Sequence, residues 1–328
     1  MPPNLMTRAF YDTIVIPEAQ APYNSVQLKL YYPAKLDPHN PTQQFGMLAA
    51  DRQQAPFPVV IFMPGMNIDP AGYRWLAEAL GQCGIATLCY QFMAEEMPGS
   101  IFSSPGLNLP AMLPDTLGQS SSSTVLTHLL DYLQRQQQQG PLQGCLNLEQ
   151  IILGGHSAGG LMAILNANPE WFSGVCGCFS YGASTAANPM LGWGENSYLP
   201  LPGRVPTLLI GGTREIEISN VSGSNPEDNA ARQASRIVQT FEQVMPPLDG
   251  KNWLVLIQDA THLMPVYPPD DTTGLGFLNP ESNQSLADHR NLLLTTLQLF
   301  IEHIITGEGS ELQNLLTSHP LVSLYQRK

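Results

Sequence analysis

The sequence predicts an α/β protein with a mostly parallel sheet that is covered on both faces by helices. Short, almost wholly apolar segments alternate with segments whose apolar residues recur at helical spacing. The chain has 328 residues, 43% of them hydrophobic, which is enough for one large core. No linker rich in Pro, Gly or Ser divides it into halves. We therefore expect one principal domain over residues 1–306, with 307–328 as a C-terminal extension.

The first half of the chain contains three expected strands and two expected helices. Residues 26–32 alternate as a half-buried strand does, whereas 58–62 and 85–90 are apolar enough to be buried on both faces. Residues 73–82 have helical spacing and stop before Gly84. A serine run opens the second helix, 124–139, and Gly140-Pro141 closes it.

The second half continues the alternation. Apolar runs predict the strands 151–154, 175–180, 207–211 and 253–257. Helical spacing predicts the helices 158–166, 230–244 and 288–305.

Three segments rich in Pro, Gly or Asn interrupt this pattern: 92–118, 182–204 and 264–283. Loops of this length in a compact domain are usually lids or binding loops. We expect 92–118 to be a lid insertion.

Charge and composition exclude several classes of protein. Only 12% of the residues are charged, and the net charge is −13, so we expect no nucleic-acid partner. No apolar run is long enough to span a bilayer, and no secretory signal is visible, which predicts a cytoplasmic protein. The five cysteines are irregularly spaced and predict neither a disulfide framework nor a zinc site. We expect no metal and no cofactor.

The strongest chemical signal is the motif Gly155-His156-Ser157-Ala158-Gly159. A β-branched strand leads into it and an apolar helix leads out, which is the setting of a nucleophile elbow. The elbow strains its central residue, so small residues must flank it. The motif predicts Ser157 as a nucleophile.

Together with residues 59–90, this motif resembles the α/β-hydrolase superfamily, in particular its cutinase, dienelactone-hydrolase and chlorophyllase-like branch. There an apolar strand ends in Pro-Gly or His-Gly, as at Pro64-Gly65, and a helix and a further strand follow. The resemblance covers roughly residues 25–305 and implies the α/β-hydrolase fold, with a catalytic domain over 1–306.

In this superfamily the acid and then the histidine follow the serine along the chain. The resemblance implies that His262, after the strand 253–257, is the base, and that the acid is in the turn after 207–211. Glu215 fits that turn, while Glu217 and Asp228 remain alternatives. A surface pair between Glu215 and Arg214 is the non-catalytic interpretation. We expect His289 to lie at the surface.

The resemblance also implies an oxyanion hole made of the backbone N–H groups of Met66 and Ala158. Flexible and aromatic side chains near the predicted loops favour an apolar substrate pocket. The residues that we expect to line it are Met63, Asn67, His156, Met93, Trp193 and Met264. His156 also fits a structural role within the elbow.

These features predict a serine hydrolase that cleaves a carboxylic ester of a moderately lipophilic small molecule. An amidase, peptidase, thioesterase or acyltransferase would use the same Ser-His-acid triad. A non-catalytic binding protein on a hydrolase scaffold is a third hypothesis, and it would require a broken triad.

Overall fold

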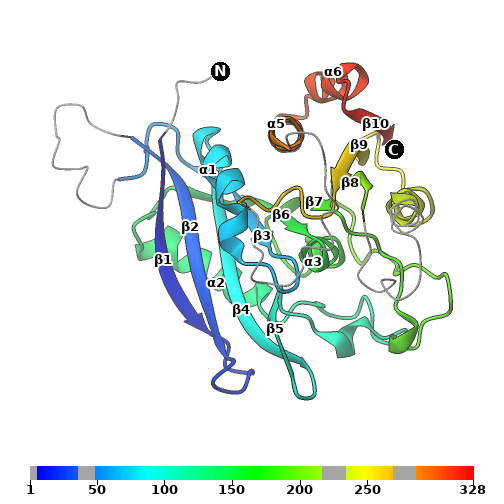
Figure 1. Ribbon diagram of the computed structural model, residues 1–328. Coiled ribbons are helices and arrows are strands. Elements are labelled where there is room, and N and C mark those ends of the chain that lie inside the picture. Colours follow the sequence, from blue (N-terminus) through cyan, green and yellow to red (C-terminus); the bar gives the residue numbers. More distant parts are fainter. Residues whose placement is uncertain (1–5, 36–48, 216–233, 269–285) are drawn as a thin grey trace.

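The computed structural model describes residues 6–35, 49–215, 234–268 and 286–328. The described residues form one 10-stranded sheet with the strand order β1-β2-β4-β3-β6-β7-β8-β9-β10, and β5 pairs with β4 (Figure 1). Six neighbouring strands run parallel, namely β4, β3, β6, β7, β8 and β9, while β1, β2, β5 and β10 pair antiparallel. The predicted α/β class with a mostly parallel sheet is confirmed.

The strands are β1 (Met6–Val15), β2 (Ser25–Ala34), β3 (Phe57–Met63), β4 (Ala86–Met97), β5 (Ser100–Ser104), β6 (Leu146–His156), β7 (Val175–Tyr181), β8 (Thr207–Arg214), β9 (Trp253–Thr261) and β10 (Val322–Arg327). The α-helices are α1 (Arg74–Gln82), α2 (Leu126–Gln139), α3 (Ala158–Asn166), α5 (Ala287–Thr306) and α6 (Ser310–Ser318). Short helical turns are η2 (Pro70–Tyr73), η3 (Leu109–Met112), η4 (Pro189–Leu191) and the π-helical η6 (Thr240–Val244).

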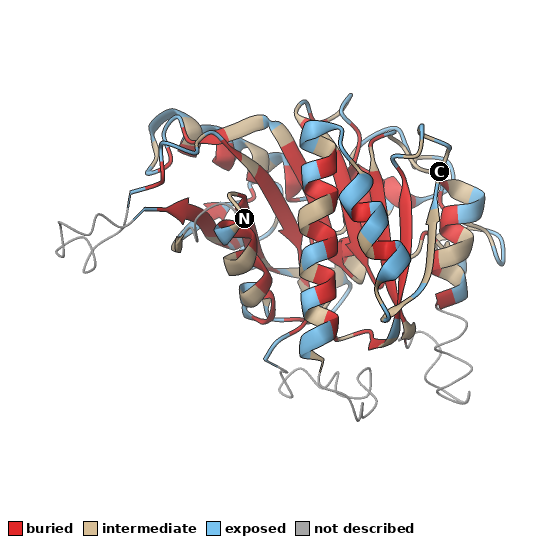
Figure 2. Ribbon diagram, turned by 90° about the horizontal axis from the view of Figure 1, so that it is seen from above, coloured by how far each residue is buried: buried red, intermediate tan, exposed pale blue. Residues whose placement is uncertain are grey.

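The sheet is covered on both faces because its central strands are apolar on both sides. In β3, Val59 and Ile61 face a core that includes α2 and α3, whereas Val60 and Phe62 face a core that includes α1, α5 and α6. Figure 2 looks down on the second layer, where the helices turn their buried sides to buried strands.

Several elements extend beyond the predicted ranges. Residues 92–118 do not form one irregular loop, because β4 continues to Met97 and turns back as β5. The strand β1 was not predicted, and it pairs with β2 at one edge of the sheet. Of the predicted helix 230–244, residues 234–239 are helical and η6 follows, while 230–233 lie outside the described residues.

The C-terminal segment 307–328 belongs to the same sheet. Its helix α6 buries Leu312 and Leu316 beside α5, and β10 then pairs antiparallel with β9 at the second edge. An antiparallel strand can be added here because β9 would otherwise expose unpaired backbone groups.

His289 is not a surface residue, and that prediction is wrong. It is 1% exposed on α5, and its Nε2 donates to the carbonyl of Gln258. The helical face that carries it is therefore turned toward the sheet.

The parallel order gathers four chain segments at one edge. β3, β6, β8 and β9 run in the same direction, so the residues after Met63, His156, Arg214 and Thr261 all leave the carboxyl edge of the sheet. Sites in open α/β sheets form at this edge.

Candidate active site

Ser157 occupies the sharp turn between β6 and α3. Its φ of 55° and ψ of −124° form a conformation that a residue with a side chain rarely adopts. Its backbone N–H donates to the carbonyl of Tyr181 at 2.9 Å, which ties the turn to β7. The Ser157 side chain is half-buried, so its hydroxyl is presented at the rim of the sheet.

The glycines around Ser157 are required by close backbone contacts. A Cβ on Gly155 would lie 2.4 Å from the carbonyl carbon of Gly159. A Cβ on Gly159 would lie 2.1 Å from the carbonyl oxygen of Met63 at the end of β3. The first turn of α3 thus sits directly on the strand that leads to the predicted oxyanion loop.

His262 lies immediately after β9 and contacts the serine. Its Nε2 is 3.0 Å from Ser157 Oγ, and its Nδ1 is 2.5 Å from Glu215 Oε2. A carboxylate can only accept, so Nδ1 carries the proton and the Nε2 lone pair faces the serine hydroxyl. This is the tautomer in which a histidine can take a proton from serine.

Glu215 follows β8 and is 0% exposed. Its second carboxylate oxygen, Oε1, accepts from the N–H of Gly212 at 3.0 Å, so both oxygens have a partner. The alternative of a surface pair with Arg214 does not describe this buried side chain. Glu217 and Asp228, the other two candidates for the acid, lie outside the described residues.

Gly182 packs against the His262–Glu215 hydrogen bond. Its φ is +65°, and a Cβ here would lie 2.9 Å from His262 Nδ1 and 3.1 Å from Glu215 Oε2. A side chain at this position would push the two groups apart. Gly182 was not among the predicted site residues, and its only sequence signal is that it directly follows a predicted parallel strand.

Three N–H groups of the loop after β3 already have a partner inside the protein. The N–H of Gly65 donates to the Tyr73 hydroxyl, that of Asn67 to the Ser103 carbonyl, and that of Ile68 to the Gly65 carbonyl. Within the described residues, the N–H of Met66 makes no hydrogen bond. It is therefore available to a ligand.

Ala158, the second predicted oxyanion donor, is the first residue of α3. The N–H groups of a first helical turn have no carbonyl of their own helix to bond, and the helix dipole adds a partial positive charge there. Both predicted donors thus leave their N–H groups open at the edge of the sheet that carries Ser157.

Three residues predicted to line the substrate pocket are corrected. Met63, His156 and Met264 are each 0% exposed. Met63, at the end of β3, and Met264, in the turn after β9, pack into the two apolar cores, one on each face of the sheet. His156 lies beneath the elbow, between the Tyr73, Tyr181 and His262 rings.

The other three predicted pocket residues have different surroundings. Asn67 has a φ of 57° and bonds to Ser103 in β5, with its Oδ1 accepting from the Ser103 N–H at 3.1 Å. Met93 is 40% exposed on β4. Trp193 is half-buried, and its indole N–H donates to the carbonyl of Met112. Asn67 therefore joins the loop after β3 to the strand β5, and the exposed Met93 remains free to contact a ligand.

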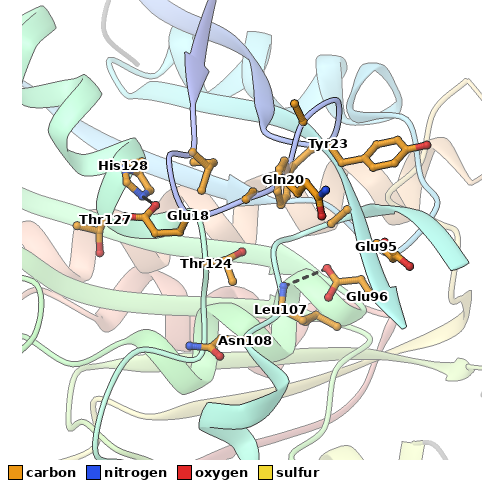
Figure 3. Close-up of a pocket in the computed structure, with 15 residues that line it drawn as sticks. Glu18, Gln20, Tyr23, Glu95, Glu96, Leu107, Asn108, Thr124, Thr127 and His128 are labelled. Carbon is orange, nitrogen blue, oxygen red and sulfur yellow. Dashed lines mark hydrogen bonds and ion pairs between the residues drawn. The ribbon is translucent and has the colours of Figure 1, made fainter. Parts of the chain in front are cut away.

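A cavity of about 650 Å³ lies away from the triad (Figure 3). Its walls come from the β1–β2 connection, the end of β4 and the start of α2, and include Glu18, Glu95, Glu96 and His128. Glu18 pairs with His128, and Glu96 accepts from the N–H of Leu107. None of the predicted site residues lines this cavity.

Among the residues that the structure describes, no three His, Cys, Asp or Glu side chains are arranged to hold a metal ion. In the same described ranges, no helix has the length and apolarity needed to cross a bilayer. All five cysteines are free thiols, and burial raises the pKa of Cys89 to about 12.

Comparison of the chain with models of known protein families gives no match. A search of curated proteins likewise gives no match.

Proposed function

We propose that this chain is a serine hydrolase of the α/β-hydrolase type that cleaves a carboxylic ester through an acyl-serine intermediate. The observation that carries the proposal is the pair of hydrogen bonds that joins Ser157, His262 and Glu215, at 3.0 and 2.5 Å. The resemblance of residues 59–90 and of the elbow motif to that superfamily supports the same assignment.

In the proposed reaction, Ser157 Oγ attacks the ester carbonyl while His262 Nε2 takes its proton. The negative charge that develops on the carbonyl oxygen is bound by the N–H groups of Met66 and Ala158. Removing one such donor typically slows an enzyme about 100- to 1,000-fold. His262 then gives its proton to the departing alcohol.

Deacylation repeats the sequence with water as the nucleophile. His262 takes a proton from the water, the hydroxide attacks the acyl-serine carbonyl, and the acid leaves as Ser157 recovers its proton. Glu215 keeps its negative charge throughout and stabilises the imidazolium that forms in each step.

The proposed substrate is a moderately lipophilic small ester. Met93, on β4, is exposed, and Trp193, in the segment after β7, is half-buried. Thioether and aromatic groups suit an irregular apolar ligand. An acyl-chain-length series on p-nitrophenyl esters measures this preference.

The experiment that tests the proposal is pre-steady-state hydrolysis of p-nitrophenyl acetate. We expect a burst of p-nitrophenol with an amplitude of one equivalent per chain, because acylation releases the phenol before water attacks. Ser157→Ala abolishes the burst, whereas the control Ser180→Ala, which removes a buried hydroxyl from β7, retains it. An undiminished burst in Ser157→Ala would contradict the proposal.

A further inference from the structure

A buried tyrosine and a buried histidine connect the loops on either side of Ser157. The Tyr73 hydroxyl accepts from the N–H of Gly65 at 3.2 Å and lies 2.8 Å from His156 Nδ1. His156 Nε2 lies 2.8 Å from the backbone carbonyl oxygen of His262. The chain of contacts therefore runs from Gly65, the residue before Met66, to the backbone of His262, the proposed base.

The direction of each hydrogen bond follows from the chemistry of its ends. The His262 carbonyl can only accept, so His156 Nε2 carries a proton. Burial, and then the nearby His262, lower the pKa of His156 well below its usual value, so the ring is neutral and Nδ1 is an acceptor. The Tyr73 hydroxyl must then donate to Nδ1, which leaves its oxygen free to accept from Gly65.

The backbone around His262 is held by two side chains from neighbouring strands. His156, at the end of β6, donates to the His262 carbonyl, and Tyr181, at the end of β7, donates to the Thr261 carbonyl at 2.8 Å. Consecutive carbonyls are thus fixed to the strands that flank the elbow. This arrangement limits the movement of the imidazole relative to Ser157.

Tyr73 and His156 also contact the proposed oxyanion loop. A Cβ on Gly65 would lie 3.1 Å from His156 Nδ1, so the loop backbone passes close to this nitrogen of the imidazole. The bond from the Gly65 N–H to Tyr73 holds the Pro64–Gly65 peptide, and the Gly65 carbonyl, which accepts from the Ile68 N–H at 3.2 Å, orients the peptide that follows. That peptide carries the N–H of Met66.

We propose that Tyr73 and His156 are positioning residues that hold the His262 backbone and the Met66 N–H in register with Ser157. This inference rests on the proposed function and extends it to two residues that do not touch the reacting atoms. Neither side chain takes part in proton transfer, since each has its polar groups bonded inside the protein.

The least disruptive test is Tyr73→Phe, which removes one hydroxyl and keeps the ring. It breaks the bonds to Gly65 and His156 without creating a cavity larger than an oxygen atom. We expect kcat on a p-nitrophenyl ester to fall roughly tenfold while KM stays within about twofold, because the donor geometry affects the transition state more than substrate binding. Tyr132→Phe, a buried tyrosine on α2, is the matched control and retains wild-type kcat.

His156 provides a graded second test. His156→Gln offers one donor and one acceptor and partly restores the network, whereas His156→Phe offers neither. We expect kcat to decrease from wild type to His156→Gln and further to His156→Phe, with each variant measured below its own unfolding temperature. The imidazole proton between His262 and Glu215 should also shift in the NMR spectra of the Phe variants at 73 and 156, which a purely structural role would not cause.

Two results overturn the inference. The first is wild-type kcat and an unshifted imidazole proton in folded Tyr73→Phe. The second is an equal loss of kcat in His156→Gln and His156→Phe. Both leave the proposed function intact as long as Ser157→Ala lacks a burst, so failure of the positioning role is distinguishable from failure of the triad.

Discussion

At the residue scale, the identity of the acid depends on burial and on hydrogen bonds that the sequence does not record. Glu215 was one of three carboxylates in one stretch of chain, and the turn after β8 favoured it. The structure adds that both of its oxygens are bonded, one to His262 and one to Gly212. Tyr73 and Tyr181 were not predicted, since His156 and the Thr261 carbonyl, which they bind, lie 83 and 80 residues away in the sequence and no motif marks the tyrosines.

Glu215 is expected to be essential because it fixes the tautomer of His262. Glu215→Gln keeps the size of the side chain and replaces an acceptor-only carboxylate by an amide. The corresponding Asp→Asn change in a serine protease lowers kcat about 10⁴-fold, and we expect a loss of that order here. Steady-state kinetics on a p-nitrophenyl ester measure it. A loss below about tenfold would mean that Glu215 is not the acid.

At the element scale, the predictions succeeded where apolar residues follow one another without interruption. The helix expected over 158–166 begins at Ala158 and ends at Asn166 as predicted. The six expected parallel strands are also present, as β3, β4, β6, β7, β8 and β9. The prediction failed for β1, β5 and β10. These are edge or hairpin strands with mixed polarity, and the sheet that they join, rather than their own sequence, makes them strands.

The β4–β5 hairpin is joined to the oxyanion loop through Asn67 and Ser103. Asn67 has a φ of 57°, a conformation that residues other than Gly, Asn and Asp adopt only at a cost of about 1–2 kcal/mol. Asn67→Gly keeps this conformation and loses the side-chain acceptor, whereas Asn67→Ala loses both. We expect kcat to fall by up to about tenfold in the alanine variant and by less in the glycine variant. Wild-type kcat in both would show that the Asn67 side chain does not support the loop.

At the scale of the whole molecule, one continuous sheet carries every part of the site. Ser157, Glu215 and His262 come from the ends of three parallel strands, and the loop with Met66 comes from a fourth. The parallel order could be predicted from the alternation of strands and helices, whereas the places of the proposed acid and base along the chain were implied by the resemblance to the α/β-hydrolase superfamily. The substrate pocket could not be predicted, because the exposure of a methionine depends on which helix covers it.

Burial of neutral His156 makes global stability depend on pH. Its pKa in the folded protein is well below the unfolded value of 6.5, so the unfolded chain binds more protons as the pH falls below 6.5. Stability is therefore unaffected above that value and decreases below it, by up to about 1.4 kcal/mol per pH unit for one proton. His303, whose pKa burial also lowers, acts with the same sign.

Urea unfolding between about pH 8 and pH 5 measures this dependence. We expect the free energy of unfolding of wild type to fall below pH 6.5, and His156→Gln to have a shallower slope because it lacks the titrating ring. Because His303 titrates in both proteins, the difference between the slopes reports on His156 alone. Equal slopes would mean that His156 is protonated in the folded protein.

The most direct measurement of the central claim is the location of a covalent fluorophosphonate adduct by mass spectrometry of the digested protein. A serine that is activated by a neighbouring histidine reacts with this probe, whereas ordinary serines do not. If His262 activates Ser157, we expect one adduct per chain on the peptide that contains Ser157, and no adduct in His262→Ala. A folded wild-type protein that carries no adduct, or carries it on another serine, would show that Ser157 is not the nucleophile.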